Sequence, residues 1–455
     1  MKTTFKYILA ASIFFSLSSC KKFLDREPIA QVTPDNIFST EKGAQSAVTG
    51  MYRTLLSPYS YGQSIVIVPE FSAQQVNHAA SYAEYTDFKS NTIRIDNPWV
   101  QNIWNASYAT INAANNVVVK VNEMPHGAIS DAKKQQFIRE GKFVRALSYF
   151  LLVRAFGDVP LIITPTGETD NLKVPRNATA DVYAQIISDL KEATLLPGNY
   201  GSTAETKGRA TSNAAKALLA KVYLYNGATT NTYTDAARLA SEVIASGGFS
   251  LQEDYASIWK TENTAESIFE LQFDEQAANT LASVSNPSPS MLFYAEGASI
   301  ANMYEDTDKR KTFTIYQNTG DPKYYIGKYR LFSPAVQNFP VIRLAELYLI
   351  HAEAQARVDG AVSTAAYNSY KKVRDRAGIS TPDNTSFSNV ASFVTAVQKE
   401  KRLELLFEGE AWFDYCRTGL ALTEMMSKAD RNYFLYPIPD AERRINTLLS
   451  QNKGY

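Results

Sequence analysis

Residues 131–160 read DAKKQQFIREGKFVRALSYFLLVRAFGDVP, and this stretch predicts one long helix. Apolar residues recur through it at helical spacing up to Phe156. Gly157 and Pro160 follow directly, and both residue types end helices. We therefore predict a helix over 131–156.

The same helical periodicity dominates the rest of the chain. Gly, Pro, Asn and Ser separate the other candidate helices, which are 41–56, 98–123, 178–194, 210–226, 234–246, 340–358, 362–377 and 390–415. Within them small residues alternate with large aromatics, as in Ala214, Ala217 and Tyr223. Consecutive pairs look like tetratricopeptide-type αα units, although no fixed period is visible. The predicted fold is mostly α, a superhelix of degenerate αα pairs.

Composition excludes several classes of function. The chain has 46 Lys and Arg against 46 Asp and Glu, without the clustered positive surplus of nucleic-acid binders. Its two cysteines are Cys20 and Cys416, and its three histidines, His78, His126 and His351, have no metal-ligand spacing. We therefore expect no disulfide, metal, cofactor or nucleic-acid site.

The N-terminus is an export signal. Lys2 and Lys6 precede an apolar run from Tyr7 to Leu17, which is too short to span a bilayer. The run ends at Leu17-Ser18-Ser19-Cys20, which resembles a bacterial lipobox. We expect removal of residues 1–19 and lipidation of Cys20, so that residues 20–455 form a single membrane-tethered domain.

Two long stretches interrupt the helical pattern, at about 58–97 and 250–334. Both are rich in Asn, Gln, Ser and aromatic residues. Long ordered insertions in a compact domain tend to carry function. Flat sugar rings stack on aromatic side chains, and their hydroxyls bind amides, carboxylates and guanidinium groups, so both insertions are candidate parts of a glycan site. The candidate ligand residues are Gln74, Asn77, His78, Tyr82, Tyr85, Phe88, Asn91, Tyr294, Asn302, Tyr304, Arg310, Tyr324 and Tyr325.

The densest charge cluster, Glu400, Arg402, Glu404 and Glu408, is a possible hydrolytic site. Glycoside hydrolysis needs paired carboxylates, and Glu404 and Glu408 share a helix face. Neighbouring arginines, Arg402 among them, would keep these carboxylates ionised, whereas an acid catalyst needs a raised pKa. We therefore interpret the cluster as ion pairs between adjacent helices, and we expect no catalytic residue.

The order of several short motifs resembles the SusD/RagB family of outer-membrane lipoproteins. The most specific is Phe143-Val144-Arg145-Ala146, then Tyr149-Phe150, then Phe156-Gly157-Asp158-Val159-Pro160-Leu161. The others, in chain order, are Phe23-Leu24-Asp25, Gly50-Met51-Tyr52, Trp104 with Tyr108, Ile111 and Asn115, Arg343-Leu344-Ala345-Glu346, Val373-Arg374-Asp375-Arg376-Ala377-Gly378, Glu400-Lys401-Arg402-Leu403-Glu404-Leu405, Trp412-Phe413-Asp414 and Pro437-Ile438-Pro439. Glu410-Ala411 and Tyr415-Cys416 depart from the family pattern.

The resemblance implies a cell-surface lipoprotein of the outer membrane without catalytic activity. Such a protein captures oligosaccharides and delivers them to a TonB-dependent, SusC-like transporter, over which it sits as a lid. Three alternatives remain open: capture of peptides, a scaffold that only grips the transporter, and a surface hydrolase. The sequence does not separate glycan from peptide capture.

Overall fold

The computed structural model describes residues 37–80, 82–167, 170–171, 173–425 and 430–455. Its helices are α3 (Glu41–Thr54), α4 (Ser64–Ser72), α5 (Glu84–Lys89), α6 (Pro98–Glu123), α7 (Asp131–Phe156), α8 (Thr179–Ala193), α9 (Thr203–Gly208), α10 (Ser212–Thr230), α11 (Tyr233–Ala245), α12 (Ser257–Lys260), α13 (Thr280–Val284), α14 (Ala298–Ala301), α15 (Lys311–Thr314), α16 (Leu344–Asp359), α17 (Thr364–Ala377), α18 (Val390–Glu404), α19 (Ala411–Thr418), α20 (Ala421–Glu424) and α21 (Asp440–Ile445). Its strands are β1 (Val76–His78), β2 (Ser267–Leu271), β3 (Phe293–Ala295), β4 (Ile315–Tyr316), β5 (Tyr325–Ile326) and β6 (Phe339–Arg343).

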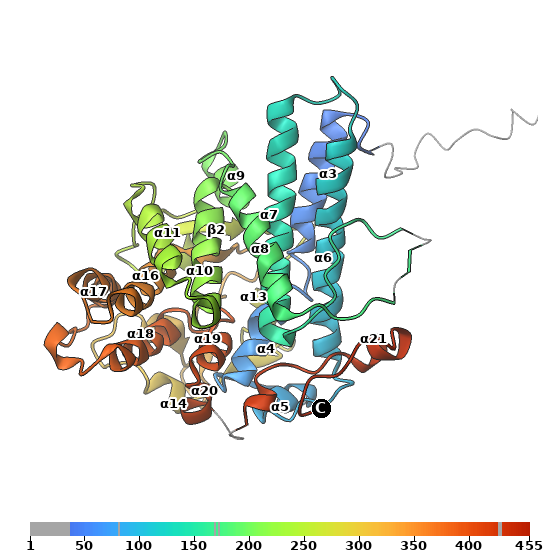
Figure 1. Ribbon diagram of the computed structural model, residues 1–455. Coiled ribbons are helices and arrows are strands. Elements are labelled where there is room, and N and C mark those ends of the chain that lie inside the picture. The colour runs from blue at the N-terminus through green and yellow to red at the C-terminus, as the bar shows by residue number, and fades with distance from the viewer. Residues whose placement is uncertain (1–36, 81, 168–169, 172, 426–429) are drawn as a thin grey trace, which may run out of the picture.

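The predicted helical superhelix is confirmed. Helix α6 packs on α7, α7 on α8, α10 on α11, α11 on α16 and α16 on α17. In Figure 1, α3, α6 and α7 stand side by side, and α10, α11, α16 and α17 continue the layer away from them. Both long predicted helices, 98–123 and 131–156, have the predicted bounds.

Small residues let the helices approach closely, as their sequence pattern predicted. A Cβ at Gly141 of α7 would lie 2.8 Å from the Cγ2 of Val118 on α6, so only glycine fits there. Ala214, Ala217 and Ala220 of α10 are fully or almost fully buried. A continuous apolar core joins most of the described elements, and a smaller cluster fills the space between α16, α17 and α18.

Two predicted helices were wrong in part. Residues 339–343 form β6, which pairs with β2 before α16 begins. The predicted helix 390–415 breaks into α18 and α19 because Phe407 and Gly409 adopt left-handed backbone angles, with φ of 69° and 84°. The carboxyl group of Glu70 holds this break, since its oxygens accept the N–H groups of Phe407 at 3.1 Å and of Gly409 at 2.7 Å.

The first insertion is more helical than predicted. It contains α4, in which every residue is buried, and the short helix α5. Figure 1 shows α4 beneath the long helices, near α19, with which it is in contact. The second insertion fits the irregular prediction better, because it combines short helices with the strands β2 to β5.

The described residues contain no helix that is long and apolar enough to cross a membrane. The predicted signal segment 1–19 and the predicted lipidation residue Cys20 lie outside the described residues.

Candidate functional site

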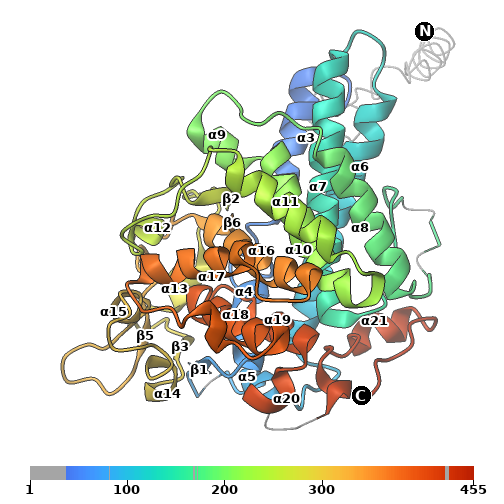
Figure 2. The ribbon, with the colours of Figure 1, turned by 60° about the vertical axis from the view of Figure 1, so that its left-hand side comes forward.

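The two insertions, about 200 residues apart in the sequence, meet in a small antiparallel sheet. Strand β1 of the first insertion pairs with β3 of the second, with Asn77 opposite Tyr294. Ala295 of β3 bridges to Tyr324, just before β5, and β5 pairs with β4. Two two-stranded sheets, β1–β3 and β5–β4, are thus joined edge to edge by this single bridge, and we call the joined strands the sheet. Figure 2 shows β1, β3 and β5 gathered at one side of the molecule, near α14 and α15.

Three tyrosines form a row across this sheet. Residues directly opposite on neighbouring strands point to the same face. The bridge between Ala295 and Tyr324 places Tyr294 opposite Tyr325, and Tyr325 in turn lies opposite Tyr316. We call Tyr294, Tyr325 and Tyr316 the tyrosine row, and Asn77 stands at its β1 end.

The other face of the sheet rests on the core, so the tyrosine row faces outward. Five side chains of that face, Val76, Phe293, Ala295, Ile315 and Ile326, are buried, while His78 and Tyr324 on the same face are half-buried. On the outward face Asn77, Tyr294 and Tyr316 are half-buried, whereas Tyr325 between them is only 2% exposed. Two partly exposed rings thus flank a buried one.

Charged groups lie at the β4 end of the row. The ring of Tyr316 lies 5.5 Å from that of Tyr325, and the guanidinium of Arg330 lies 4.2 Å from the Tyr316 ring centre. The Tyr325 hydroxyl donates to the carboxylate of Asp321, and this hydrogen bond lowers the pKa of Asp321. The row therefore offers aromatic faces, an amide, an ionised carboxylate and a guanidinium within one surface.

Sequence reasoning named Asn77, Tyr294 and Tyr325 but missed Tyr316, Asp321 and Arg330 as site members. Tyr316 belongs to the same aromatic-rich insertion, so its residue type was a usable signal. The strand register that brings it next to Tyr325 joins segments separated by a loop, and no local pattern reveals it.

Five other predicted residues lie around the sheet with some exposed surface: Gln74, His78, Tyr82, Asn302 and Tyr324. Both ring nitrogens of His78 are engaged, with the carbonyl oxygen of Ala79 and the hydroxyl of Thr86, each at 2.8 Å. The Gln74 amide donates to the Lys89 carbonyl at 3.1 Å. The hydrogen bonds of His78 and Gln74 hold the loop that carries β1. Among the five residues, only Asn302 is largely exposed.

The remaining five predicted residues are buried, which contradicts a direct role in ligand contact. Tyr85 is fully buried between Phe71 and Trp99, with ring centres 4.4 and 4.8 Å away. Phe88 packs on Tyr436, and Asn91 is buried in a left-handed turn with φ of 52°.

Tyr304 and Arg310 are likewise interior residues. The Tyr304 hydroxyl donates to the Leu403 carbonyl at 2.9 Å. Arg310 pairs with Asp308 at 2.7 Å and with Glu400 at 2.7 Å. Both were predicted as ligand residues, but their side chains serve packing and charge pairing in the interior.

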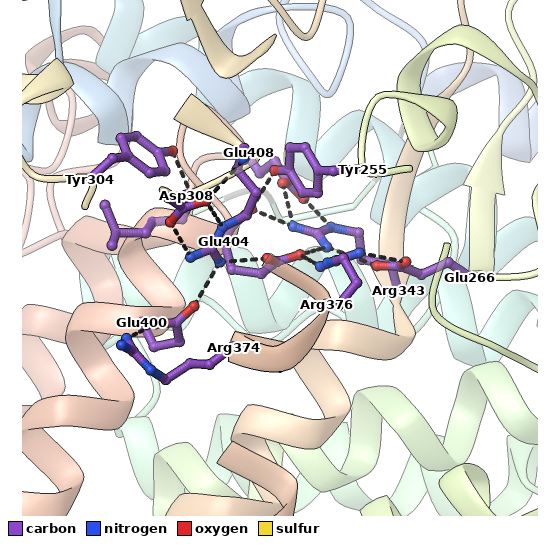
Figure 3. Close-up of polar contacts among 12 residues, drawn as sticks. Tyr255, Glu266, Tyr304, Asp308, Arg343, Arg374, Arg376, Glu400, Glu404 and Glu408 are labelled. Atoms are coloured by element: carbon purple, nitrogen blue, oxygen red, sulfur yellow. Dashed lines mark hydrogen bonds and ion pairs between the residues drawn. The ribbon is translucent and has the colours of Figure 1, made fainter. Parts of the chain in front are cut away.

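The charge cluster of α18 is structural, as the sequence interpretation held. Glu404 pairs with Arg310 at 2.8 Å and also with Arg343 and Arg376, and all four side chains are 5% exposed or less (Figure 3). Burial opposes the charge on Glu404, but the three guanidinium groups outweigh it and hold its pKa well below the usual value. Such a carboxyl cannot act as an acid catalyst at neutral pH.

Some partners within this cluster differ from the sequence interpretation. Arg402 does not pair with Glu404, and instead points its guanidinium toward the Gln75 side chain and the Ala73 carbonyl, each at 3.4 Å. Arg343, which the sequence interpretation did not include in the cluster, pairs with Glu404, Glu266 and Glu408. The Arg343 and Glu408 contact at 2.8 Å ties β6 to the segment after α18.

A buried lysine connects the cluster to the sheet. Lys328, two residues after β5, is fully buried and pairs with Glu408 at 2.5 Å. Its ammonium lies 4.9 Å from the ring centre of Trp259. Lys328 thus links the segment that follows strand β5, which carries Tyr325, to the buried charge cluster.

Gly327 provides a test of the pairing between β4 and β5. Its N–H donates to the Thr314 carbonyl at 2.8 Å, and an added Cβ would collide with the backbone of Phe313. We expect Gly327→Ala to force β4 and β5 apart and to cost about 1–3 kcal/mol of unfolding free energy, the usual range for overpacking.

Thermal unfolding measures the effect, and Gly198→Ala is the matched control because nothing lies within 4 Å of a Cβ there. A melting temperature of Gly327→Ala equal to that of Gly198→Ala would contradict the described pairing of β4 with β5.

Glu70 makes stability depend on pH. Burial raises the pKa of its carboxyl to about 8, despite the two backbone N–H groups that favour the charged form. Between the unfolded value near ~4.3 and about 8, the folded chain holds one more proton than the unfolded chain, so this group's contribution to stability falls as pH rises, by at most ~1.4 kcal/mol per pH unit.

We expect Glu70→Gln to lose less stability than the unaltered chain between pH 5.5 and 7.5. Urea unfolding at pH 5.5 and at pH 7.5 gives the change in unfolding free energy for each protein. The other titrating groups contribute equally to both changes, so the difference between the two proteins reports on Glu70 alone. Glu41→Gln, at the exposed start of α3, is the control and should leave the pH dependence unchanged. If the unfolding free energy changes with pH equally in Glu70→Gln and in the unaltered chain, the raised pKa of Glu70 is contradicted.

The described residues contain no group of three or more His, Cys, Asp or Glu side chains that could hold a metal ion.

Comparison with family models gives two matches along the chain. A model described as starch-binding, associating with the outer membrane, matches residues 22–224, and the SusD family model matches residues 332–430. Among curated proteins, a SusD-like protein of Bacteroides ovatus is 25% identical over 91% of this chain and 82% of its own length. SusD-like protein P2 of Formosa agariphila is 26% identical over 97% of this chain and 98% of its own.

Solved structures give the same picture of the fold. A SusD superfamily protein from Parabacteroides distasonis superposes with a TM-score of 0.80, at 26% identity, over 91% of this chain and 99% of its own. Surface glycan-binding protein A from Bacteroides uniformis also gives a TM-score of 0.80, over 91% of this chain and 99% of its own, at 22% identity.

Proposed function

Because this chain belongs to the SusD family, we propose that it captures oligosaccharides at the cell surface and that the tyrosine row is part of its binding site. The matching family model describes starch-binding proteins that associate with the outer membrane, which supports a carbohydrate ligand. The observation that carries the location is the pair of partly exposed rings, Tyr294 and Tyr316, on either side of the buried Tyr325, because two distant insertions build this surface together.

The spacing of the row favours an oligosaccharide over a single sugar. Tyr294 and Tyr316 lie on strands separated by β5, and neighbouring strands are ~4.8 Å apart, so the two exposed rings stand ~10 Å from each other along the sheet. One pyranose ring cannot cover both. A chain of sugars can place rings on Tyr294 and Tyr316 in turn while its hydroxyls reach Asn77, Asp321 and Arg330.

The proposed binding is non-catalytic. The carboxylates of Glu400 and Glu404 are buried and paired with arginines, away from the exposed surface of the row. Each contact on such a shallow surface is weak, and several contacts to one chain add to a useful affinity.

The proposal also includes anchoring of the protein to the outer membrane and delivery of the ligand to a transporter. Lipidation at Cys20 would tether residues 20–455, as one domain, to the outer membrane with the row facing the cell exterior. A SusC-like TonB-dependent transporter would then receive the ligand from beneath the lipoprotein, and hinge opening between the two would admit it.

A binding screen of the soluble chain that starts after Cys20 tests this function. Plant, host and microbial oligosaccharides and a peptide mixture are titrated calorimetrically. The proposal predicts saturable binding to one oligosaccharide class. Binding to peptides alone would support peptide import, and no binding to either would support a scaffold role; both results contradict glycan capture.

A further inference from the structure

A second surface feature, away from the tyrosine row, lies against α6 and α21. It is a groove of about 410 Å³ between α6, the segment after α7 and the C-terminal segment. Its apolar walls include Trp104, Tyr108, Ile111, Ile162, Ile445 and Leu449. In Figure 2 α21 lies on the opposite side of the molecule from β1, β3 and β5.

Large apolar side chains are exposed around this groove. Ile445 is 67% exposed, Leu448 53% and Ile163 43%, although aliphatic residues of this size are usually buried. Ile445 lines the groove itself, and Leu448 and Ile163 are next in sequence to the lining residues Leu449 and Ile162. Surfaces of this kind, rimmed by polar residues, mark interaction sites.

Three polar side chains of the groove are engaged within the chain. The Asn115 amide donates to the carbonyls of Ile162 and Thr164 at 3.0 and 2.9 Å. The Asn446 amide donates to the Val174 carbonyl at 2.7 Å, and the Tyr108 hydroxyl to the Pro160 carbonyl at 2.8 Å. These hydrogen bonds hold the segment between α7 and α8 in place as one wall of the groove.

One carboxylate in the groove lacks a counter-charge. Glu442 lines it and is half-buried, and within the described part of the chain no cation pairs with it. Burial raises the pKa of its carboxyl. The nearby basic residues have other partners: Arg444 pairs with Asp440 at 2.6 Å, and Arg443 donates to the Leu449 carbonyl at 3.1 Å.

We propose that this groove docks a segment of a partner protein that inserts an aliphatic or aromatic side chain against Trp104 and Tyr108 and sets a lysine or arginine on Glu442. Aromatic floor, apolar rim and a partly desolvated charge are the features of an interface hot spot. The inference is independent of the glycan site, because none of its residues belongs to the tyrosine row.

Two labelled peptides of sequence Ser-Gly-Lys-Leu-Trp-Gly-Ser and Ser-Gly-Glu-Leu-Trp-Gly-Ser, with blocked ends, provide the test. Fluorescence polarisation measures their binding to the soluble chain. We expect the lysine peptide to bind at least tenfold more tightly than the glutamate peptide. Glu442→Gln should remove most of this preference, and Ile445→Asp with Leu448→Asp should weaken both peptides at least tenfold.

These three positions are half-buried or exposed, so the variants should fold, and thermal unfolding checks this. Tyr294→Ala is the matched control and should leave peptide binding unchanged. Equal binding of the two peptides, binding of neither, or a preference that survives Glu442→Gln would overturn the proposal. Displacement of the lysine peptide by an oligosaccharide would also overturn it, because the groove would then be a sugar site.

Discussion

Replacing Tyr294 and Tyr316 together by alanine is expected to abolish measurable oligosaccharide binding, while the chain stays folded. Each ring should contribute about 1.4 kcal/mol or more through stacking, which corresponds to a tenfold loss of affinity for each single substitution. The two side chains are half-buried at the surface and their strands are held by backbone pairing, so the cost to folding should be small beside the cost to binding.

Calorimetric titration of the single and double variants measures this effect. Tyr294→Phe and Tyr316→Phe keep the rings and should retain most of the affinity. Tyr367→Ala on α17 is the matched control, since Tyr367 is a half-buried tyrosine outside the row. If the double variant binds as tightly as the unaltered chain, the site does not lie on this sheet.

Glu404→Gln is expected to destabilise the fold by about 3–5 kcal/mol, the usual cost of breaking a buried ion pair by removal of one partner. The substitution leaves Arg310, Arg343 and Arg376 close together in the interior with less negative charge to offset them. Since domains are stable by only ~5–15 kcal/mol, this loss would be a large fraction of the total.

Urea unfolding measures the loss, and Asp375→Asn serves as the control. Asp375 pairs with Lys371 on the surface of α17, where both side chains are more than two-fifths exposed, and such pairs contribute ~0–1 kcal/mol. A loss below 1 kcal/mol for Glu404→Gln would contradict the structural role of the cluster.

The helical scaffold could be predicted because its signals are local. The predicted bounds of α6 and α7 match the structure because the cap residues Asn97 and Ser130 and the stop at Gly157 lie within or next to each helix. The prediction failed between α18 and α19, where the break depends on Glu70, more than 300 residues earlier in the chain.

The surface proposed here as the site could be predicted only as far as the two insertions that form it. An excess of aromatic and amide residues identified both insertions, but composition cannot tell an exposed ring from a buried one. Tyr85 and Tyr294 have the same residue type, yet Tyr85, on the helix α5, packs between Phe71 and Trp99 while Tyr294 faces outward from β3. Long-range packing buries the first, and the strand register, set by long-range pairing, turns the second outward.

Native gel electrophoresis in polysaccharide-containing gels tests most directly whether the tyrosine row captures glycans. The unaltered soluble chain and the Tyr294→Ala, Tyr316→Ala double variant run side by side in gels that each contain one polysaccharide. We predict that at least one polysaccharide retards the unaltered chain and that the double variant migrates freely in the same gel. Equal retardation of both proteins, or free migration of both in every gel, would contradict the account.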